Sequence, residues 1–575
     1  MKRYWKYIRP YIQYYILGPC FMMMEVVGDV LLPYMLAKII NQGIAERNVV
    51  YIIKIGVIMG FIAVIMAVGG VLGAWFASKA AMNFGADLRM DLFEKIQQFS
   101  FQNIDNFSTG SLITRLTNDI TQIQNMIMMT LRMCLRSSGI LIGAMVMAFV
   151  ISPKLAAIFI IVLPVLAVLI VVIMRRAFPQ FRTLQEKLDA LNSCIQEGLV
   201  GIRLIKSFVR GDYEEMRFEK RNQQLKEANL TAMKTMLLYT PLMTLALNIT
   251  TVVVVWSGGN MIVAGNMQVG DLTAFTNYIV QIMSSLTMLS IAFLNWARAI
   301  ASFRRVGEVL DEKIDLTDEN AKHKDRAVCE GSVEFQNVSF RYYKNSPEWV
   351  IENISFKLEA GKTLGIIGPT GSGKSTLVSM IPRLYDTDEG TVLVDGINVR
   401  DYGLKPLREG IGMVLQNNTL FSGSITENLK WGDEHADEKA VRKAAQNAQA
   451  AGFIDSFKDG YRTRLEQSGN NVSGGQKQRL CIARALLKCP KILILDDSTS
   501  AVDTATERAI REALHSEYKD MTKIIIAQRI RSVMDADEIL VLDNGKTAGF
   551  GTHEQLLADC PVYREIYDVQ NGREE

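Results

Sequence analysis

The chain has few of the residues that build disulfide frameworks or metal centres. Its seven cysteines are scattered along 575 residues without a Cys-x-x-Cys pair, and it contains four histidines. This spacing argues against a disulfide scaffold and a zinc site, so the thiols are expected to be reduced. A strong excess of one charge is also missing, because 63 basic and 60 acidic residues leave a net charge of +3. Nucleic acid is therefore not an expected partner.

A cleavable leader is not expected either. The N-terminal stretch MKRYWKYIRPYIQYY is basic and aromatic, and the apolar run behind it continues without a small-residue cleavage site. Such a segment suits a short helix that lies at the inner surface of a membrane.

Two regions of different composition divide the sequence. A chain of 575 residues is too long for a single core, and several apolar runs of membrane-spanning length lie in its first half. The charged stretch VGEVLDEKIDLTDENAKHKDRAV follows, and the remainder has the composition of a soluble protein. We predict a transmembrane domain over residues 1–305, a linker over 306–330 and a soluble domain over 331–575.

The first region contains six runs that are long enough to cross a bilayer as helices, each needing about 20 apolar residues. Long polar loops follow the second and fourth runs. Basic residues precede the first run and fill the second long loop, so both termini and both long loops are expected to be cytoplasmic. The expected spans are about 14–42, 51–78, 127–151, 155–178, 236–264 and 272–298.

Four charged residues fall inside the expected spans. Glu25 and Asp29 lie four residues apart on one face of the first span, and Arg132 and Arg136 repeat that spacing in the third. Charges are costly in a bilayer and are therefore candidates for function. Either these residues pair to hold the bundle together, or the two acids line a polar cavity that attracts cationic substrates. The sequence leaves both alternatives open.

The soluble region carries a phosphate-binding loop. GPTGSGKST lies between the strand-like TLGIIG and a helix, and Gly368 to Ser375 match the pattern G-x-x-x-x-G-K-[ST] in full. Lys374 adds a point charge, and Ser375 is expected to ligate Mg²⁺. Asp496, at the end of the strand-like KILILDD, is expected to supply an outer-sphere carboxylate for that ion. The residues expected to bind ATP here are Gly368, Thr370, Gly371, Ser372, Gly373, Lys374, Ser375 and Thr376.

A second anion-binding edge occurs about 100 residues later in the chain, at the start of the helix in NVSGGQKQRLCIARAL. Exposed N–H groups and a small hydroxyl suit a phosphate. One domain holds one nucleotide at its own loop, so this edge is best used on a nucleotide that a second domain holds. The residues concerned are Ser473, Gly474, Gly475 and Gln476.

These features resemble the ATP-binding cassette (ABC) exporters over essentially the whole chain. GPTGSGKST corresponds to the Walker A motif, VLQNNTL to the Q-loop, VSGGQ is similar to the LSGGQ signature, and ILILDD corresponds to Walker B. The resemblance implies an α-helical membrane domain of six transmembrane helices joined to an α/β P-loop NTPase cassette, with ATP and Mg²⁺ as cofactors. It also implies short coupling helices in the long loops, near residues 103–112 and 205–213.

The resemblance assigns further roles to single residues. Tyr342 matches the aromatic residue that stacks on adenine, with Tyr343 as an adjacent alternative, and Gln416 would contact Mg²⁺ and sense the membrane domain. SAVD resembles the D-loop, which implies roles for Ser500, Ala501 and Asp503.

Two residues depart from the family pattern at the hydrolytic site. The family's general base is a Glu directly after the Walker B Asp, and this chain has Asp497, whose carboxylate is withdrawn by about 1.5 Å, one C–C bond. Gln528 stands where the family has a switch His, and it cannot carry a proton or a positive charge. A displacement of about 1 Å can cost on the order of 100-fold in rate. The expected result is a degenerate site that binds ATP and hydrolyses it poorly, although Asp497 acting as a slow base stays an alternative.

This departure has a consequence for assembly. The family sandwiches each ATP between one cassette's Walker motifs and the signature of its partner. We therefore expect a heterodimer in which Ser473, Gly475 and Gln476 complete the active site of a second half-transporter that has the consensus Glu and His. The predicted function is ATP-driven export of amphipathic or lipophilic compounds, such as drugs, across the bacterial cytoplasmic membrane. The alternatives are a lipid or peptide exporter on the same scaffold, or a regulatory membrane subunit that binds ATP without transport.

Overall fold

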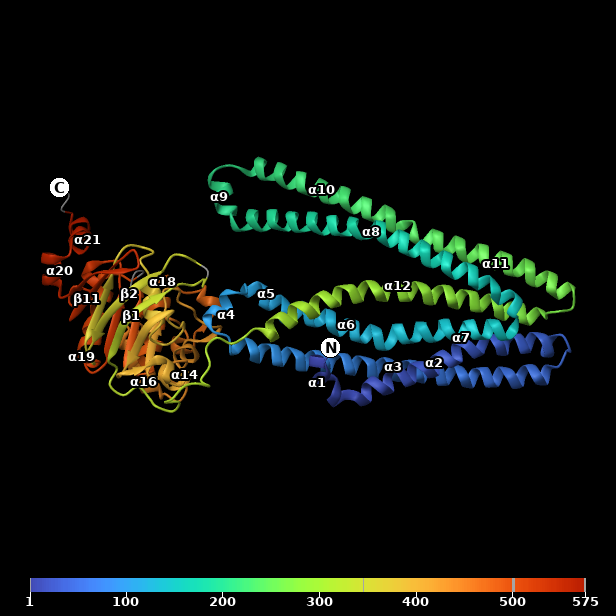
Figure 1. Cartoon of the computed structure of the whole chain (residues 1–575), viewed down its shortest axis with the longest axis horizontal. Helices are drawn as coiled ribbons and strands as arrows, with labels where there is room; N and C mark the ends of the chain where they lie inside the picture. Colours follow the sequence, from blue (N-terminus) through green and yellow to red (C-terminus); the bar gives the residue numbers. More distant parts are fainter. Residues whose placement is uncertain (1, 345, 499–501, 573–575) are drawn as a thin grey trace. The chain divides into compact units, whose positions relative to one another are not determined.

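The computed structural model describes residues 2–344, 346–498 and 502–572. The chain divides into two compact units (Figure 1). The first, which we call the helical unit, comprises Met1–Gln97 and Thr109–Asp311, and the second, the α/β unit, comprises Gln98–Ser108 and Glu312–Glu575. A short piece of the first long loop therefore belongs to the second unit.

The helical unit contains the apolar spans. In the described residues, six helical segments are long and apolar enough to cross a membrane, in agreement with the predicted number. Short 3₁₀ or π-helical turns join several of the helices. Their bounds are α1 (Trp5–Ile8), α2 (Ile12–Lys38), α3 (Val49–Gln97), α5 (Thr109–Thr114), α6 (Ile120–Met129), α7 (Leu135–Ile151), α8 (Pro153–Val200), α9 (Ile202–Ser207), α10 (Gly211–Leu237), α11 (Tyr239–Val263) and α12 (Val269–Asp311).

α2 and α3 pack closely because small residues of α3 face α2. A Cβ atom at Gly69 would lie 3.0 Å from the carbonyl oxygen of Phe21, and one at Gly73 would lie 2.5 Å from the end of Met22. Lipid tails are as apolar as the helices, so membrane helices associate through this close fit rather than through hydrophobic burial.

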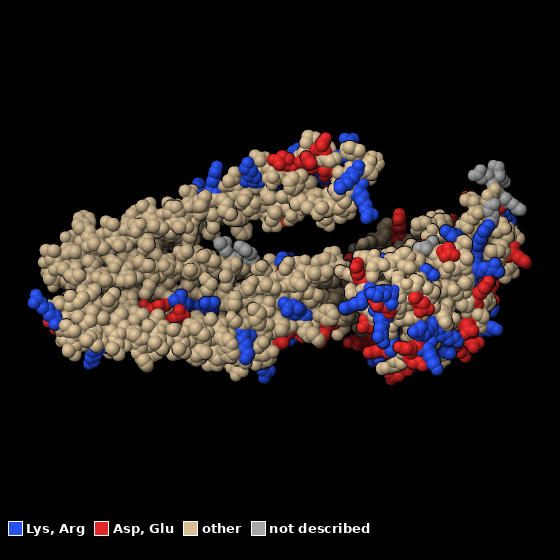
Figure 2. Space-filling model, turned by 180° about the vertical axis from the view of Figure 1, so that it is seen from behind, with Lys and Arg blue, Asp and Glu red and all other residues tan. Residues whose placement is uncertain are grey.

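α8 and α10 form a hairpin whose tip is α9 (Figure 1). α10 packs chiefly against α8, while α11 continues from α10 and packs against α8 and α12. The long helices α3, α8 and α10 thus extend the apolar spans into polar segments. Charged side chains are dense on the α/β unit and sparse on the visible surface of the helical unit (Figure 2).

The α/β unit is built on two main sheets. The larger has the order β12-β11-β3-β10-β9-β6 and is parallel except for β12, and the smaller is antiparallel with the order β2-β1-β4-β5. The strands are β1 (Val333–Phe340), β2 (Ile351–Leu358), β3 (Thr363–Ile367), β4 (Glu389–Val394), β5 (Ile397–Asn398), β6 (Ile411–Val414), β7 (Gly423–Ser424), β8 (Arg464–Leu465), β9 (Ile492–Asp496), β10 (Thr522–Ile526), β11 (Glu538–Asp543) and β12 (Lys546–Gly551).

Helices complete the α/β unit. Buried Ile and Leu side chains of β9 and β10, such as Ile494 and Ile524, lie in its cores, as expected for parallel strands covered on both faces. The helices are α4 (Phe101–Asp105), α13 (Lys374–Ser379), α14 (Leu404–Glu409), α15 (Ile425–Leu429), α16 (Glu438–Asn447), α17 (Ala451–Ser456), α18 (Gly474–Leu487), α19 (Thr504–Glu517), α20 (His553–Asp559) and α21 (Pro561–Asn571).

α4 comes from the first long loop and is fastened to the α/β unit. Ser100 caps the helix, since its hydroxyl accepts from the Asn103 N–H and the Asn103 side chain accepts from the Ser100 N–H. Asn103 is 1% exposed and donates from Nδ2 to the carbonyl oxygen of Lys313 at 2.9 Å. Tyr385 donates its hydroxyl to Asp105 at 3.0 Å, and its ring lies 6.0 Å from that of Phe101. α9, from the second long loop, stays in the helical unit. The two long loops are therefore held differently.

Candidate functional site

The phosphate-binding loop has a backbone that depends on glycine at three positions. Gly368 follows β3 directly, and a Cβ there would lie 2.0 Å from the carbonyl oxygen of Leu542. Gly373 has φ +89 and precedes α13, and its Cβ would lie 2.6 Å from Ile351. Gly371 also has a positive φ, +86, but has open space around it. The loop thus needs glycine for conformation at two of these positions and for space at Gly368 and Gly373.

Lys374 lies folded over this loop. Its Nζ donates to the carbonyl oxygens of Gly368 at 2.9 Å and Pro369 at 2.7 Å. Burial lowers the pKa of the Lys374 ammonium, and the nearby carboxylates of Asp496 and Asp497 act in the opposite direction. A cation whose positive charge is only partly compensated suits an incoming polyphosphate.

A serine hydroxyl and a carboxylate meet at the end of β9. Ser375 Oγ donates to Asp496 Oδ1 at 2.9 Å, and Asp496 is 4% exposed. Burial raises the pKa of the Asp496 carboxyl, and the hydrogen bond from Ser375 opposes that shift. Gln416 lies exposed just after β6.

These oxygen donors fit Mg²⁺ rather than a metal held entirely by protein. The described residues contain no group of three or more His, Cys, Asp or Glu able to hold a metal. Mg²⁺ is typically bound by one or two protein oxygens, with water and substrate phosphates completing its octahedron. Ser375 and Asp496 provide such a pair, so the residues present fit the ion.

Tyr342 is held beside the loop. Its hydroxyl lies 2.9 Å from Thr376 Oγ1, and its ring makes edge-on contacts with Phe340 and Tyr385 at 5.1 and 5.3 Å between centroids. It is 36% exposed, whereas the adjacent Tyr343 is 77% exposed. Tyr342 therefore presents an oriented ring close to the helix that starts at Lys374.

The two residues that depart from the family pattern contact each other. Gln528, two residues after β10, donates from Nε2 to Asp497 Oδ2 at 2.9 Å. Asp497 has φ +47, and its N–H donates to the carbonyl oxygen of Ile526. Burial raises the pKa of the Asp497 carboxyl, and the bond from Gln528 opposes that shift. One carboxylate oxygen at the base position is thus occupied by an amide donor.

The signature residues form a helix cap. Ser473 Oγ accepts from the Gln476 N–H, Gln476 Oε1 accepts from the Ser473 N–H, and Gly474 begins α18. Ser473 and Gly474 are exposed. Of the expected D-loop residues, Ser500 and Ala501 lie outside the described residues, and Asp503 caps α19 by accepting from Thr506.

The charged residues inside the spans form an ion-pair cluster. A single nitrogen of Arg136 lies 3.0 Å from Glu25 and 2.9 Å from Asp29, joining α7 to α2. Gln281 of α12 donates to the carbonyl oxygen of Asp29 at 2.8 Å. Figure 2 shows a small group of acidic and basic atoms within the uncharged surface of the helical unit. Of the two alternatives that the sequence leaves open, pairing is present for Glu25, Asp29 and Arg136, and both acids are still partly exposed.

One residue of the site could not be found from the sequence. The side-chain amide of Gln570, on α21, bonds the main chain on both sides of Arg529. A cavity of about 600 Å³ is lined by Asp497, Gln528 and Gln570, among others. Gln570 lies 42 residues from Gln528 in sequence, and no motif marks it.

Comparisons with known proteins cover both units. The family model "ABC transporter transmembrane region" matches residues 15–286, and the family model "ABC transporter" matches residues 351–500. A solved structure, that of a bacterial Atm1-family ABC exporter with ATP bound, matches with a TM-score of 0.81 and 24% identity, over 98% of each chain. At this identity the match concerns the fold.

Relatives of similar length share more sequence. The "Uncharacterized ABC transporter ATP-binding protein YfiB" of Bacillus subtilis is 39% identical and is matched over 100% of this chain and 99% of its own. The "Putative multidrug export ATP-binding/permease protein YgaD" of the same organism is 33% identical, over 99% of each chain.

The glycines of the loop give a test of its geometry. Gly371→Ala should cost the full chain only the strain of a left-handed residue, about 1–2 kcal/mol. Gly373→Ala adds a steric clash with Ile351 to the same strain and should be clearly more destabilising. Thermal unfolding of the two purified variants measures the difference, and equal unfolding midpoints would show that the loop is not packed as described.

Proposed function

The chain belongs to the ABC transporters, and from this premise we propose that it is one half of a heterodimeric exporter and carries a degenerate ATP site. The family relation makes the protein an ATPase coupled to transport, with a membrane domain and a cassette fused in one chain. Of the two composite sites, the one built on the Walker motifs of this chain would hold ATP, and the one built on the partner's Walker motifs would hydrolyse it.

The contact between Gln528 and Asp497 carries the proposal. A general base must place a free carboxylate lone pair on the attacking water, within hydrogen-bond reach. Asp497 is one methylene shorter than Glu, and Gln528 Nε2 already donates to one of its oxygens at 2.9 Å. The amide gives no positive charge and accepts no proton in return. The site is therefore suited to holding ATP rather than to rapid turnover.

The remaining parts of the cassette are suited to binding. The contacts of Lys374 with the loop, of Ser375 with Asp496 and of Tyr342 with Thr376 support binding of phosphates, Mg²⁺ and adenine here. When bound, Mg²⁺ would neutralise phosphate charge, held by Ser375 and Asp496 and approached by Gln416. Ser473 and Gly474, at the start of the cap, are exposed and would be available for a nucleotide on another cassette. Two copies of this chain would have two weak sites, so the partner should carry Glu and His.

The tip of the α8–α10 hairpin supports the need for a partner. Leu204, Phe208 and Val209 at α9 are 61%, 70% and 88% exposed. By contrast, α4 is covered by its own cassette through Asn103 and Tyr385. An uncovered apolar patch of this kind marks a docking surface. We propose that the cassette of the partner subunit covers α9.

The cluster in the spans supports a cationic cargo. One guanidinium against two carboxylates leaves one negative charge on Glu25, Asp29 and Arg136 together. A negative charge that is partly exposed inside an apolar bundle favours amphipathic cations. The relative YgaD is named for multidrug export, which agrees with lipophilic drugs or dyes as substrates. In this proposal the cassette and both termini face the cytoplasm of a bacterium.

Two alternative functions can be distinguished from the proposed drug export by experiment. A lipid or peptide exporter would use the same scaffold with a different cavity, and a regulatory subunit would bind ATP without moving a solute. ATP-dependent accumulation of a cationic dye in sealed inside-out vesicles separates the proposed exporter from both.

The degenerate site predicts a gain of function. The purified chain should bind MgATP but hydrolyse it slowly, and Asp497→Glu with Gln528→His should raise the ATPase rate by about 100-fold, because the base regains its reach and its partner. Adding Asp496→Asn should remove the gain. Rapid hydrolysis by the unmodified chain without a partner would contradict the degenerate site.

The α9 patch predicts an uncoupled variant. Phe208→Asp places a charge at a surface that must be dry when covered. Export in vesicles should be lost while ATP binding by the chain is unchanged. Leu230→Asp is a matched control, because Leu230 is 50% exposed on α10, outside the expected membrane span and away from the tip. Normal export by Phe208→Asp would exclude α9 as a docking surface.

The charged cluster predicts a change in substrate preference. Asp29→Asn removes the excess negative charge and leaves Arg136 paired with Glu25 at 3.0 Å. The KM for a cationic dye should rise by about tenfold, as expected for losing one attractive charge at short range. The KM for a neutral lipophilic dye should stay the same. Equal effects on both dyes would show that the cluster only supports the bundle.

A further inference from the structure

The loop that carries Gln528 is bonded by a side chain from the last helix. Gln570 Nε2 donates to the carbonyl oxygen of Gln528 at 2.8 Å, and Gln570 Oε1 accepts from the N–H of Ile530 at 2.8 Å. Arg529 between them has φ −103 and ψ 129, an extended conformation. In an extended chain the carbonyl of one residue and the N–H two residues later point to the same side. One primary amide therefore pairs with this segment as a neighbouring strand would.

The helix that presents Gln570 is itself firmly anchored. Tyr563 of α21 is completely buried, and its hydroxyl lies 2.7 Å from Nδ1 of His553 on α20. It belongs to the core cluster that contains Ile367, the last residue of β3 before the phosphate-binding loop, and Ile530. The amide of Gln570 thus has a fixed position relative to both the phosphate-binding loop and the Gln528 loop.

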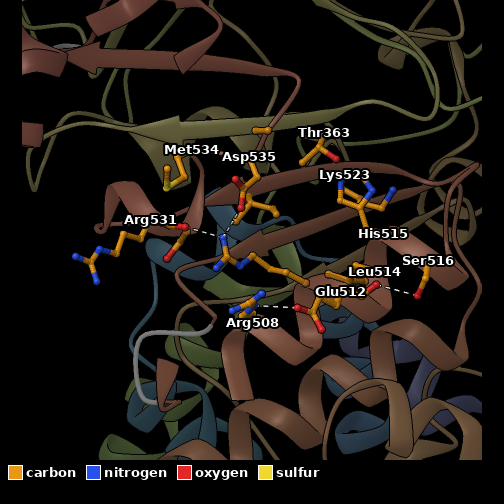
Figure 3. A pocket seen from close by; sticks show the side chains of 14 residues that line it. Thr363, Arg508, Glu512, Leu514, His515, Ser516, Lys523, Arg531, Met534 and Asp535 are labelled. Atoms are coloured by element: carbon orange, nitrogen blue, oxygen red, sulfur yellow. Dashed lines mark hydrogen bonds and ion pairs between the residues drawn. The ribbon is translucent and has the colours of Figure 1, made fainter. Parts of the chain in front are cut away.

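The chain beyond Ile530 is held from another helix, α19. Arg511 Nη1 donates to the carbonyl oxygen of Arg531 at 2.6 Å, and Ser532 donates to the buried Glu507 at 2.5 Å. A cavity of about 750 Å³ lies between α19 and this segment, with Arg531 and Asp535 on one side and Glu512 below (Figure 3). α19 thus anchors Arg531 and Ser532, and β10 ends at Ile526. The main chain around Arg529 spans these two anchors, and Gln570 bonds to it.

We propose that Gln570 is a positioning residue of the nucleotide site. It holds the main chain at Gln528 so that the Gln528 side chain reaches Asp497 Oδ2, where it can also bond a terminal phosphate. The last helix of the chain thereby sets how firmly a bound nucleotide is retained. This role concerns the ATP site whether it hydrolyses slowly or rapidly, so it does not rest on the heterodimer.

Two substitutions remove the clamp in different ways. Gln570→Met keeps the length of the side chain and removes both hydrogen bonds, and Gln570→Asn keeps the amide but is shorter by about 1.5 Å, one C–C bond. The control is Val569→Ala, because Val569 is the preceding residue of α21 and is 74% exposed. The readout is the dissociation rate of N-methylanthraniloyl-ATP with Mg²⁺ from the full-length chain in lipid nanodiscs, together with the thermal unfolding midpoint.

Gln570→Met and Gln570→Asn should each release the nucleotide about tenfold faster, in line with the loss of two modest hydrogen bonds. Val569→Ala should leave the rate unchanged. In a Gln528→Ala background, Gln570→Met should change the rate less than about twofold, because the group that it positions is gone.

An unchanged rate in both Gln570 variants would overturn the proposal. An equal change in the Gln528→Ala background would also overturn it, since Gln570 would then act as a general support of the fold. If one Gln570 variant fails to fold, the other variant decides. A thermal unfolding midpoint equal to that of Val569→Ala shows that this other variant is folded.

Discussion

The parallel pairing of β3, β10 and β9 is the constraint on which the nucleotide site depends. Ile366, Ile526 and Asp496 lie at the same level across these three strands. The segments that leave their carboxyl ends therefore meet at one edge, although they come from residues far apart in the chain. One strand delivers the phosphate-binding loop, another the two aspartates, and the middle strand Gln528. Ligands of open α/β sheets bind at this edge for the same reason.

Much of this arrangement could be predicted from the sequence, because local patterns encode it. The six spans follow from long apolar runs, and Gly368 to Ser375 form a motif whose spacing is dictated by a tight turn. Which arginine pairs with Glu25 and Asp29 could not be predicted in the same way. Arg132 and Arg136 are both candidates, and only the packing of α7 on α2 brings Arg136 to the two acids. The role of Gln570 could not be predicted because its two hydrogen bonds are to main-chain atoms, and such bonds do not depend on the residue type of the partner.

The departures at Asp497 and Gln528 are consistent with each other when their contact is considered. A shortened carboxylate alone would leave a gap, and a neutral amide alone would leave a base without its partner. Together they make a closed hydrogen bond at 2.9 Å, so the pair is stable before any nucleotide arrives. The same cassette keeps a regular cap at Ser473 and a regular phosphate loop. The contact between Asp497 and Gln528 thus falls on atoms that would handle water.

The uneven treatment of α4 and α9 also bears on the life of the protein in the cell. α4 is covered by its own cassette, whereas Leu204, Phe208 and Val209 at the tip are exposed. In the proposed heterodimer the cassette of the partner subunit would cover them. An orphan copy would display this tip to chaperones and proteases, which recognise exposed apolar segments. Production of the two subunits in equal amounts would then be enforced after translation, by removal of whichever copy is left unmatched.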